Sequence, residues 1–166
     1  MNKNLYIGIL GGSFDPPHEG HLNISKAALT KMKLNEIWWI VTSSNPFKIK
    51  SSLFSKRYKQ TKEYVSNKNI RIIQLDEKKS AFTIDTVLYL KKKYPKYNFI
   101  WLMGSDNLID LHKWKSWKEI FYNIPIAIFD RPLYSFTLTK FKSLVYFRKE
   151  KVSKSLIKKF KNFEPP

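Results

Sequence analysis

The sequence predicts an α/β protein with a Rossmann-like, doubly wound parallel sheet and helices on both faces. Two observations lead to this prediction. Short apolar runs with the length of buried strands alternate along the chain with segments whose apolar residues recur at helical spacing. Loop signals rich in Gly, Pro or Ser follow several of these runs, and in an open parallel sheet such loops gather where ligands bind.

The first strand–loop–helix unit carries the most informative stretch of the chain, the glycine-rich loop at residues 11–21. The apolar run 5–10 before it predicts a buried strand, and the apolar residues of 22–32 share one face of a helix. The loop holds three of the five glycines and two of the three histidines. Glycines let backbone N–H groups approach a ligand, and a helix that begins here directs its positive end to the same place.

Two imidazoles complete this pattern. His18 and His21 are three residues apart on the first turn of the expected helix, so their side chains share a face. We therefore predict a phosphate site with two imidazole donors, rather than a tight turn with two surface histidines. The loop contains neither the Gly-Lys-Ser/Thr of a Walker loop nor the G-x-G-x-x-G of a dinucleotide loop.

The next unit places basic side chains after a second strand. The run 36–42 predicts a buried strand, and Lys48 on the loop after it could reach nucleotide phosphates or simply be solvated. A helix is expected over 52–66, on which Arg57 could contact phosphate or lie on the surface. The run 70–75 predicts a third strand.

Two further loops carry carboxylates. Thr83 is expected to cap a helix with Asp85 in its first turn, where the helix dipole favours a carboxylate even without a ligand. The run 98–103 predicts a fourth strand. The Gly-Ser-Asp turn after it puts Asp106 either at an ordinary helix N-cap or in a site, on a ribose hydroxyl or a metal-bound water.

The last third of the chain offers aromatic and basic candidates. Trp114 and Trp117 are expected on a short helix and could both belong to the core. The run 124–129 predicts a fifth strand, closed by Arg131 toward the same edge of the sheet. One more strand is expected at 144–147.

The glycine-rich loop resembles the signature of the nucleotidylyltransferase superfamily, a Gly-rich turn that ends in His-x-Gly-His. Later segments make the chain similar to bacterial nicotinate-nucleotide adenylyltransferases, namely 45–48, 83–86, 103–107, 114–117 and 130–132. The resemblance covers about residues 5–148. It implies a nucleotidylyltransferase domain over 1–148 and a basic C-terminal tail over 149–166.

The resemblance also implies a reaction, adenylyl transfer from ATP to nicotinate mononucleotide, which gives deamido-NAD and pyrophosphate in NAD biosynthesis. It assigns His18 and His21 to catalysis and to ATP, with Mg²⁺ held by ATP and water rather than by a protein cage. The further ATP contacts are Gly11, Gly12, Ser13, Phe14, Gly104, Asp106 and Arg131. The acceptor contacts are Asp15, Lys48, Thr83, Asp85 and Trp114, the last stacking on the pyridine ring.

Other functions stay open at this point. The same fold and reaction would serve nicotinamide mononucleotide or phosphopantetheine as the acceptor. The net charge of +18, from 31 Lys and Arg against 13 Asp and Glu, also suits a basic RNA-binding module. The chain has no RNA-recognition strand motif, and its aromatic residues sit in apolar runs rather than among the lysines, so nucleic acid is the less favoured partner.

Composition sets the wider limits. The 166 residues, 43% of them apolar, suffice for one domain with a core. The absence of cysteine excludes disulfides and thiol chemistry, and no apolar run approaches the ~20 residues of a membrane span. Because the chain enters its first strand without a signal peptide, we expect a cytoplasmic enzyme. The oligomeric state is left open.

The C-terminal end departs from the family pattern. The family continues into a Ser-Thr-x-x-Arg-type segment that helps to bind phosphate, and Ser153 and Ser155 lie among lysines without forming it. We therefore expect weak nucleotide binding, slow turnover and a poorly ordered tail from Lys149. Either a truncation or a degenerate enzyme would produce this pattern.

Overall fold

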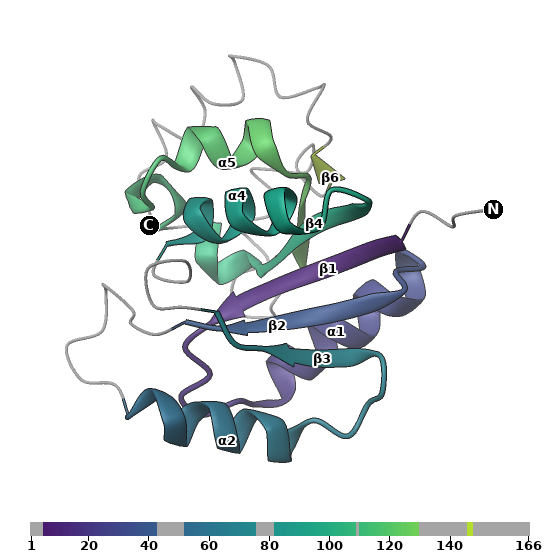
Figure 1. The fold of residues 1–166 in the computed structure, drawn as a ribbon, viewed down its shortest axis with the longest axis vertical. Coiled ribbons are helices and arrows are strands. Elements are labelled where there is room, and N and C mark those ends of the chain that lie inside the picture. The colour runs from purple at the N-terminus through teal and green to yellow at the C-terminus, as the bar shows by residue number, and fades with distance from the viewer. Residues whose placement is uncertain (1–4, 43–51, 76–81, 109, 130–145, 148–166) are drawn as a thin grey trace.

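A six-stranded sheet forms the centre of the computed structural model, which describes residues 5–42, 52–75, 82–108, 110–129 and 146–147 (Figure 1). The strands are β1 Leu5–Gly12, β2 Glu36–Val41, β3 Ile70–Ile73, β4 Tyr97–Gly104, β5 Ile126–Phe129 and β6 Tyr146–Phe147. The helices are α1 Glu19–Lys31, α2 Phe54–Tyr64, α4 Thr83–Lys93 and α5 Trp117–Asn123, with the 3₁₀ turns η1 Ser105–Leu108 and η2 Leu111–Lys113. Lys48, Arg131 and the tail predicted for 149–166 lie outside the described residues.

The predicted doubly wound parallel sheet is confirmed for its first five strands. β1 pairs in parallel with β2 and β4, β2 with β3, and β4 with β5. β6 pairs with β5 in the antiparallel direction and makes the sheet mixed at that edge, and the strand expected at 144–147 is confirmed for its described residues 146–147. The order β3-β2-β1-β4-β5-β6 reverses direction between the neighbouring strands β1 and β4.

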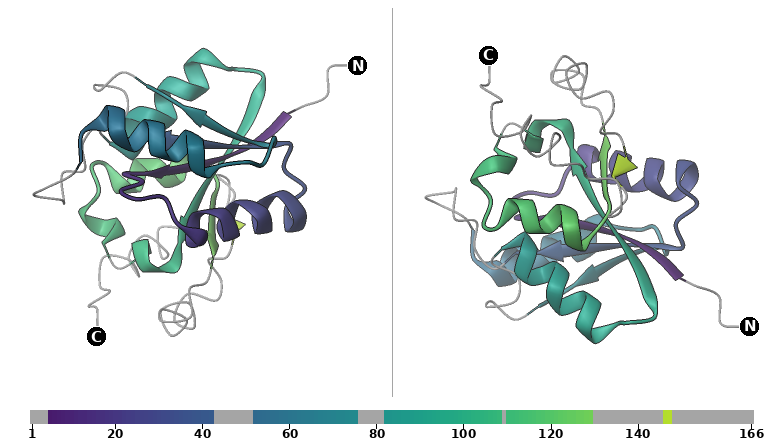
Figure 2. Two further views of the ribbon diagram at one scale, coloured as in Figure 1. Left: turned by 90° about the horizontal axis from the view of Figure 1, so that it is seen from below. Right: turned by 90° about the horizontal axis from the view of Figure 1, so that it is seen from above.

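Strand β2 illustrates how the sheet is buried on both faces. Ile37, Trp39 and Val41 belong to one apolar cluster, whereas Trp38 and Ile40 belong to the other. Because successive side chains of a strand point to opposite faces, an almost continuous apolar run is what a sheet covered on both sides requires. α1 and α2 pack on the first cluster and α4 and α5 on the second. The ribbons of these four helices can be found by their colours in the two views of Figure 2.

Two local expectations are corrected by the structure. Helix α4 begins with Thr83 itself, and Phe82 is the N-cap without a side-chain cap bond, so the prediction of Thr83 as the cap is wrong by one position. Trp114 and Trp117 do not share a helix, because Trp114 is the C-cap that follows η2 and Trp117 begins α5. Ser116 between them has a left-handed backbone with φ 47°, which separates the two elements. Among the described residues, no helix is both long and apolar enough to cross a membrane.

Candidate functional site

A cavity of about 330 Å³ opens at the carboxyl ends of β1 and β4, where the strand order reverses. This crevice of an open parallel sheet is where ligands bind, and the cavity is large enough for a small molecule. The predicted site residues on its wall are Gly11, Gly12, Ser13, Phe14, Asp15, His18, His21, Gly104, Asp106 and Trp114. The structure therefore brings together loops that are about ninety residues apart in the sequence.

The two histidines are held by reciprocal hydrogen bonds at the start of α1. His18 is the N-cap, and its Nδ1 accepts from the Gly20 N–H at 3.1 Å. The main-chain N–H of His18 in turn donates to Nδ1 of His21 at 3.2 Å. Since Nδ1 accepts in both rings, the neutral imidazoles carry their protons on Nε2, an assignment that follows from the hydrogen-bond network. With ring centroids 3.9 Å apart, the pair offers two N–H donors side by side.

His21 is supported from behind by buried aromatic residues. The Phe14 ring lies 4.7 Å from the His21 ring and stacks on Trp39 at 4.8 Å between centroids. The Trp39 indole N–H donates to Ser25 Oγ at 2.8 Å, and Ser25 Oγ donates to the His21 carbonyl at 2.9 Å. Sequence reasoning missed this support. Its one available signal was Ser25, a polar residue on an otherwise apolar helical face.

Gly11 and Gly12 differ in how much room their surroundings leave for a side chain. A Cβ on Gly11 would lie 2.5 Å from Cη2 of Trp101 on β4, so Gly11 permits the close packing of β1 against that side chain. A Cβ on Gly12 would meet Phe14 at 3.4 Å, an ordinary contact. Neither glycine has a positive φ. Packing against Trp101 therefore requires glycine at position 11. At position 12, contacts within the protein alone do not require glycine.

The carboxylates on the cavity wall have local partners. Asp106 lies within η1 rather than at a helix N-cap, and its Oδ1 accepts from Nδ2 of Asn107 at 3.4 Å. Asn107 also lines the cavity and was not predicted as a site residue. Asp15 accepts from both the N–H and the hydroxyl of Ser52, each at 2.9 Å. In the part of the chain that the structure describes, no group of three or more His, Asp or Glu residues is arranged as a metal cage.

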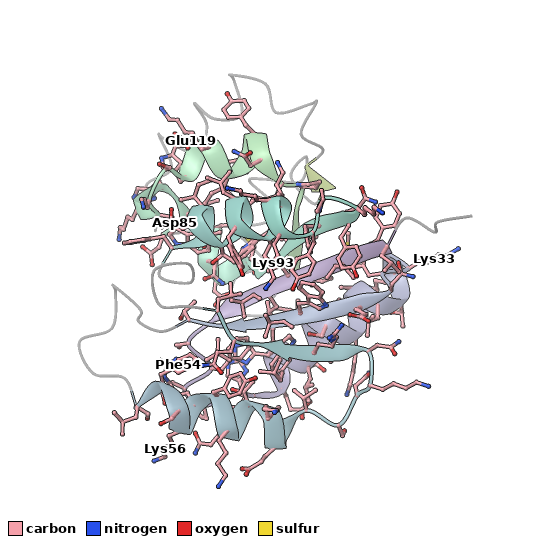
Figure 3. All side chains as sticks on the ribbon, viewed as in Figure 1. Lys33, Phe54, Lys56, Asp85, Lys93 and Glu119 are labelled. Atoms are coloured by element: carbon pink, nitrogen blue, oxygen red, sulfur yellow. The ribbon has the colours of Figure 1, made fainter. Side chains whose placement is uncertain are left out.

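The start of α4 lies beside the cavity wall rather than on it. Neither Thr83 nor Asp85 lines the cavity, and Asp85, labelled in Figure 3, pairs with Lys115 Nζ at 3.0 and 3.2 Å. Lys115 follows Trp114, which packs against the core on one side and lines the cavity on the other. The ion pair therefore ties the first turn of α4 to the segment that carries this tryptophan. Trp117 packs edge-on against Phe121 and is absent from the described cavity wall.

Arg57 adopts neither of its two predicted roles. Its side chain is 1% exposed, so it is not a surface residue, and it does not line the cavity. The guanidinium instead donates to the main-chain carbonyls of Ser13, Thr42 and Ser52. Its place on the inner face of α2 explains the difference, because that face packs against the sheet and the glycine-rich loop.

Comparison with known sequences finds several relatives that share one name. Residues 9–160 match the family model described as cytidylyltransferase-like. A "Probable nicotinate-nucleotide adenylyltransferase" of Ruegeria sp. (strain TM1040) is 41% identical over 128 residues, which cover 76% of this chain and 68% of that protein. Proteins of the same name from Erythrobacter litoralis and Brucella abortus are each 39% identical, over 81% and 76% of this chain and 63% and 66% of theirs. The chain thus spans about two thirds of the length of these curated relatives.

Solved structures show the same fold. The Plasmodium falciparum nicotinic acid mononucleotide adenylyltransferase complexed with NaAD matches with a TM-score of 0.72 at 22% identity, over 95% of this chain and 72% of that one. The complex of that enzyme with APC matches with a TM-score of 0.67 at 21% identity, over 95% and 71%. At these identities the likeness concerns the fold alone.

Proposed function

The chain belongs to the cytidylyltransferase-like family, among its nicotinate-nucleotide adenylyltransferases, and on that premise we propose that it transfers the adenylyl group of ATP to nicotinate mononucleotide. The products are deamido-NAD and pyrophosphate, a step of NAD biosynthesis. One observation carries the proposal. The paired imidazoles of His18 and His21 and the glycine-rich loop lie on one cavity at the point where the strand order reverses.

The proposed reaction needs positioning more than it needs a reactive side chain. A 5′-phosphate oxygen of nicotinate mononucleotide forms a bond to the α-phosphorus of ATP, while the bond from that phosphorus to the bridging oxygen of the β-phosphate breaks. The electron pair of the broken bond leaves with pyrophosphate. Because the attacking group is already an anion, no protein nucleophile is required, and the protein aligns the reactants and neutralises charge.

The donors on the cavity wall support the proposed ATP side of the site. In this proposal, the Nε2–H of His21 donates a hydrogen bond to the α-phosphate in the transition state, and the Nε2–H of His18 donates one to the neighbouring ATP phosphates. Backbone N–H groups of the glycine-rich loop and the positive end of α1 add to the same anion site. Gly104, Asp106 and Arg131 complete the ATP contacts in this proposal, with Asp106 accepting from a ribose hydroxyl.

The acceptor side centres on Trp114, which stacks on the pyridine ring. Its partly buried ring on the cavity wall supports this role. Asp15 and Lys48 are proposed to contact the acceptor nucleotide. Thr83 and Asp85 border the acceptor at the start of α4, where the ion pair of Asp85 with Lys115 holds the segment that carries Trp114.

Mg²⁺ accompanies ATP in this proposal. The cavity wall offers the hard oxygen donors of Asp106 and Asn107, and the described residues contain no three-residue His/Cys/Asp/Glu cage. This donor set fits Mg²⁺, which keeps water and substrate phosphate oxygens in most of its coordination positions. ATP phosphate oxygens and water would hold most of the ion's coordination positions, and the ion would supply charge neutralisation on the ATP phosphates when bound.

A side-by-side assay tests the function. The purified chain is incubated with ATP and Mg²⁺ and with nicotinate mononucleotide, nicotinamide mononucleotide or phosphopantetheine, and pyrophosphate and the adenylylated product are measured. We expect the fastest turnover with nicotinate mononucleotide, and none in a His18→Ala/His21→Ala double variant that stays folded. Faster turnover with another acceptor would reassign the substrate. Salt-dependent RNA binding by a folded protein without any turnover would favour the RNA-binding alternative.

A further inference from the structure

Arg57 is the charged residue that the structure buries most completely among the described residues, with 1% of its surface exposed. Burying a cation is costly unless its hydrogen-bonding groups find partners. The pKa of the Arg57 guanidinium lies below its ordinary value because burial disfavours the charged form, and the Asp15 carboxylate opposes part of that effect. A charge kept in such a place calls for a reason beyond packing.

The partners of the guanidinium come from three separate segments. Nη1 donates to the Ser13 carbonyl at 2.6 Å and to the Thr42 carbonyl at 2.9 Å, and Nε donates to the Ser52 carbonyl at 3.0 Å. Ser13 belongs to the glycine-rich loop, Thr42 follows β2, and Ser52 precedes α2. The Phe54 ring covers the guanidinium, with 5.6 Å from Cζ to the ring centroid. One side chain on α2 thus joins the loop to the end of a neighbouring strand.

Neighbouring bonds reinforce this connection. Thr42 donates to the Gly12 carbonyl with its main-chain N–H at 2.9 Å and with Oγ1 at 3.2 Å. Ser52 donates to both carboxylate oxygens of Asp15. The carbonyls of Gly12 and Ser13 and the side chain of Asp15 are therefore all engaged by residues at the end of β2 and at the start of α2 or within it.

The geometry of the peptide bond relates these carbonyl hydrogen bonds to the direction of the loop's N–H groups. In a planar trans peptide, the carbonyl of one residue and the N–H of the next point in opposite directions. The bond from Arg57 to the Ser13 carbonyl thus sets the direction of the Phe14 N–H, and the bonds from Thr42 set that of the Ser13 N–H. Ser13 and Phe14 line the cavity, whereas Arg57 and Thr42 do not, so these N–H groups are directed to the cavity side.

We propose that Arg57 is a positioning residue that holds the main chain of the glycine-rich loop in the orientation that receives the ATP phosphates. The inference rests on the proposed function, because it assumes that this loop binds ATP. Arg57 itself touches no substrate in this arrangement. Lysine is a poor substitute, since a single ammonium cannot reproduce the planar fork that reaches several carbonyls at once.

The test compares Arg57→Lys and Arg57→Met with matched changes at Arg71, which also lies over an aromatic ring, that of Trp38, but pairs with Glu36 away from the loop. Calorimetry gives the affinity for Mg²⁺-ATP, and steady-state kinetics give KM and kcat for each substrate. We expect kcat/KM for ATP to fall by about 10²-fold in both Arg57 variants, the scale of a small misplacement of positioning groups. The Arg71 variants should match wild type.

A second readout separates this inference from the proposed function. Hydrogen exchange at the Thr42 and Ser52 amides, whose N–H groups bond to the glycine-rich loop at Gly12 and Asp15, should speed up in ligand-free Arg57→Lys and stay unchanged in Arg71→Lys. If wild type binds no ATP, the proposed function fails, and exchange alone then decides the role of Arg57. Unchanged exchange and unchanged ATP affinity in folded Arg57 variants would overturn the inference. So would loss of the folded state in both variants, which would make Arg57 a stability residue.

Discussion

The main-chain N–H of His18 and Nδ1 of His21 are joined by a hydrogen bond of 3.2 Å at the start of α1. This single contact ties the fold of the helix terminus to the chemistry of the cavity. It caps the helix, and it also places the proton of the His21 ring on Nε2. Nδ1 of His21 therefore stabilises the helix terminus, whereas Nε2 is the proposed donor to the substrate. Substitutions can separate these two roles.

The first prediction uses this separation. In His21→Asn, the amide oxygen can still accept near the position of Nδ1, but the donor at Nε2 is lost. We expect kcat to fall by about 10²-fold or more, the scale of a lost electrostatic donor, with little change in melting temperature. His21→Gln places an N–H near Nε2 and should retain more activity. Near-normal turnover in a folded His21→Asn would contradict the proposed role of the imidazole.

The second prediction concerns the aromatic wall of the cavity. If Trp114 stacks on the pyridine ring, nicotinate mononucleotide should quench tryptophan fluorescence. Trp114→Phe should remove most of that quenching and raise KM for this substrate more than KM for ATP. Trp117→Phe is the control, because Trp117 packs against Phe121 away from the cavity wall. Equal effects on both substrates would instead assign Trp114 to the core alone.

The third prediction compares two adjacent glycines. Gly11→Ala drives a methyl group into Trp101, so the free energy of unfolding should fall by about 1–3 kcal/mol, as in other overpacked cores. Gly12→Ala makes only an ordinary contact and should change stability by about 0.5 kcal/mol or less. Urea unfolding of the two variants measures both values. Equal destabilisation would mean that the packing of Trp101 does not decide the choice of glycine.

The fourth prediction addresses the support behind His21. Ser25→Ala leaves the buried Trp39 indole N–H without its acceptor, which should cost about 1–3 kcal/mol of unfolding free energy. The control is Thr30→Ala on the same helix, where an exposed hydroxyl bonds only to main-chain carbonyls of its own turn. That change should cost about 0.5 kcal/mol or less. A Ser25→Ala protein as stable as Thr30→Ala would show that the indole finds another partner.

The fifth prediction separates two roles for Asp85. Its ion pair with Lys115 is partly exposed, with 31% and 49% of the two side chains accessible, and should contribute at most about 1 kcal/mol to stability. If Asp85 acts by holding the segment that carries Trp114, Asp85→Asn and Lys115→Gln should raise KM for nicotinate mononucleotide equally. The double variant should then be no worse than either single one. A larger effect of Asp85→Asn would indicate direct contact with the acceptor.

Local patterns determined much of this protein. The spacing of His18 and His21 predicted that the two rings lie close together, and they do, although His18 is the extended N-cap of α1 rather than part of its first turn. The apolar run of β2 required cover on both faces, and the alternation of strands and helices predicted the parallel sheet. These features depend on a few consecutive residues and on backbone geometry.

Tertiary structure decided what depends on distant partners. Asp106 and Trp114 line the same cavity as the glycine-rich loop because β4 lies beside β1. The order of strands in a sheet depends on the whole chain and cannot be read from a local pattern. The antiparallel pairing of β6 with β5 and the ion pair of Asp85 with Lys115 likewise depend on residues far apart in the sequence. An arginine on an amphipathic helix is equally compatible with solvent and with ligand from sequence alone. Only the placement of α2 against the loop turned Arg57 inward, where three main-chain carbonyls offset the cost of burying its charge.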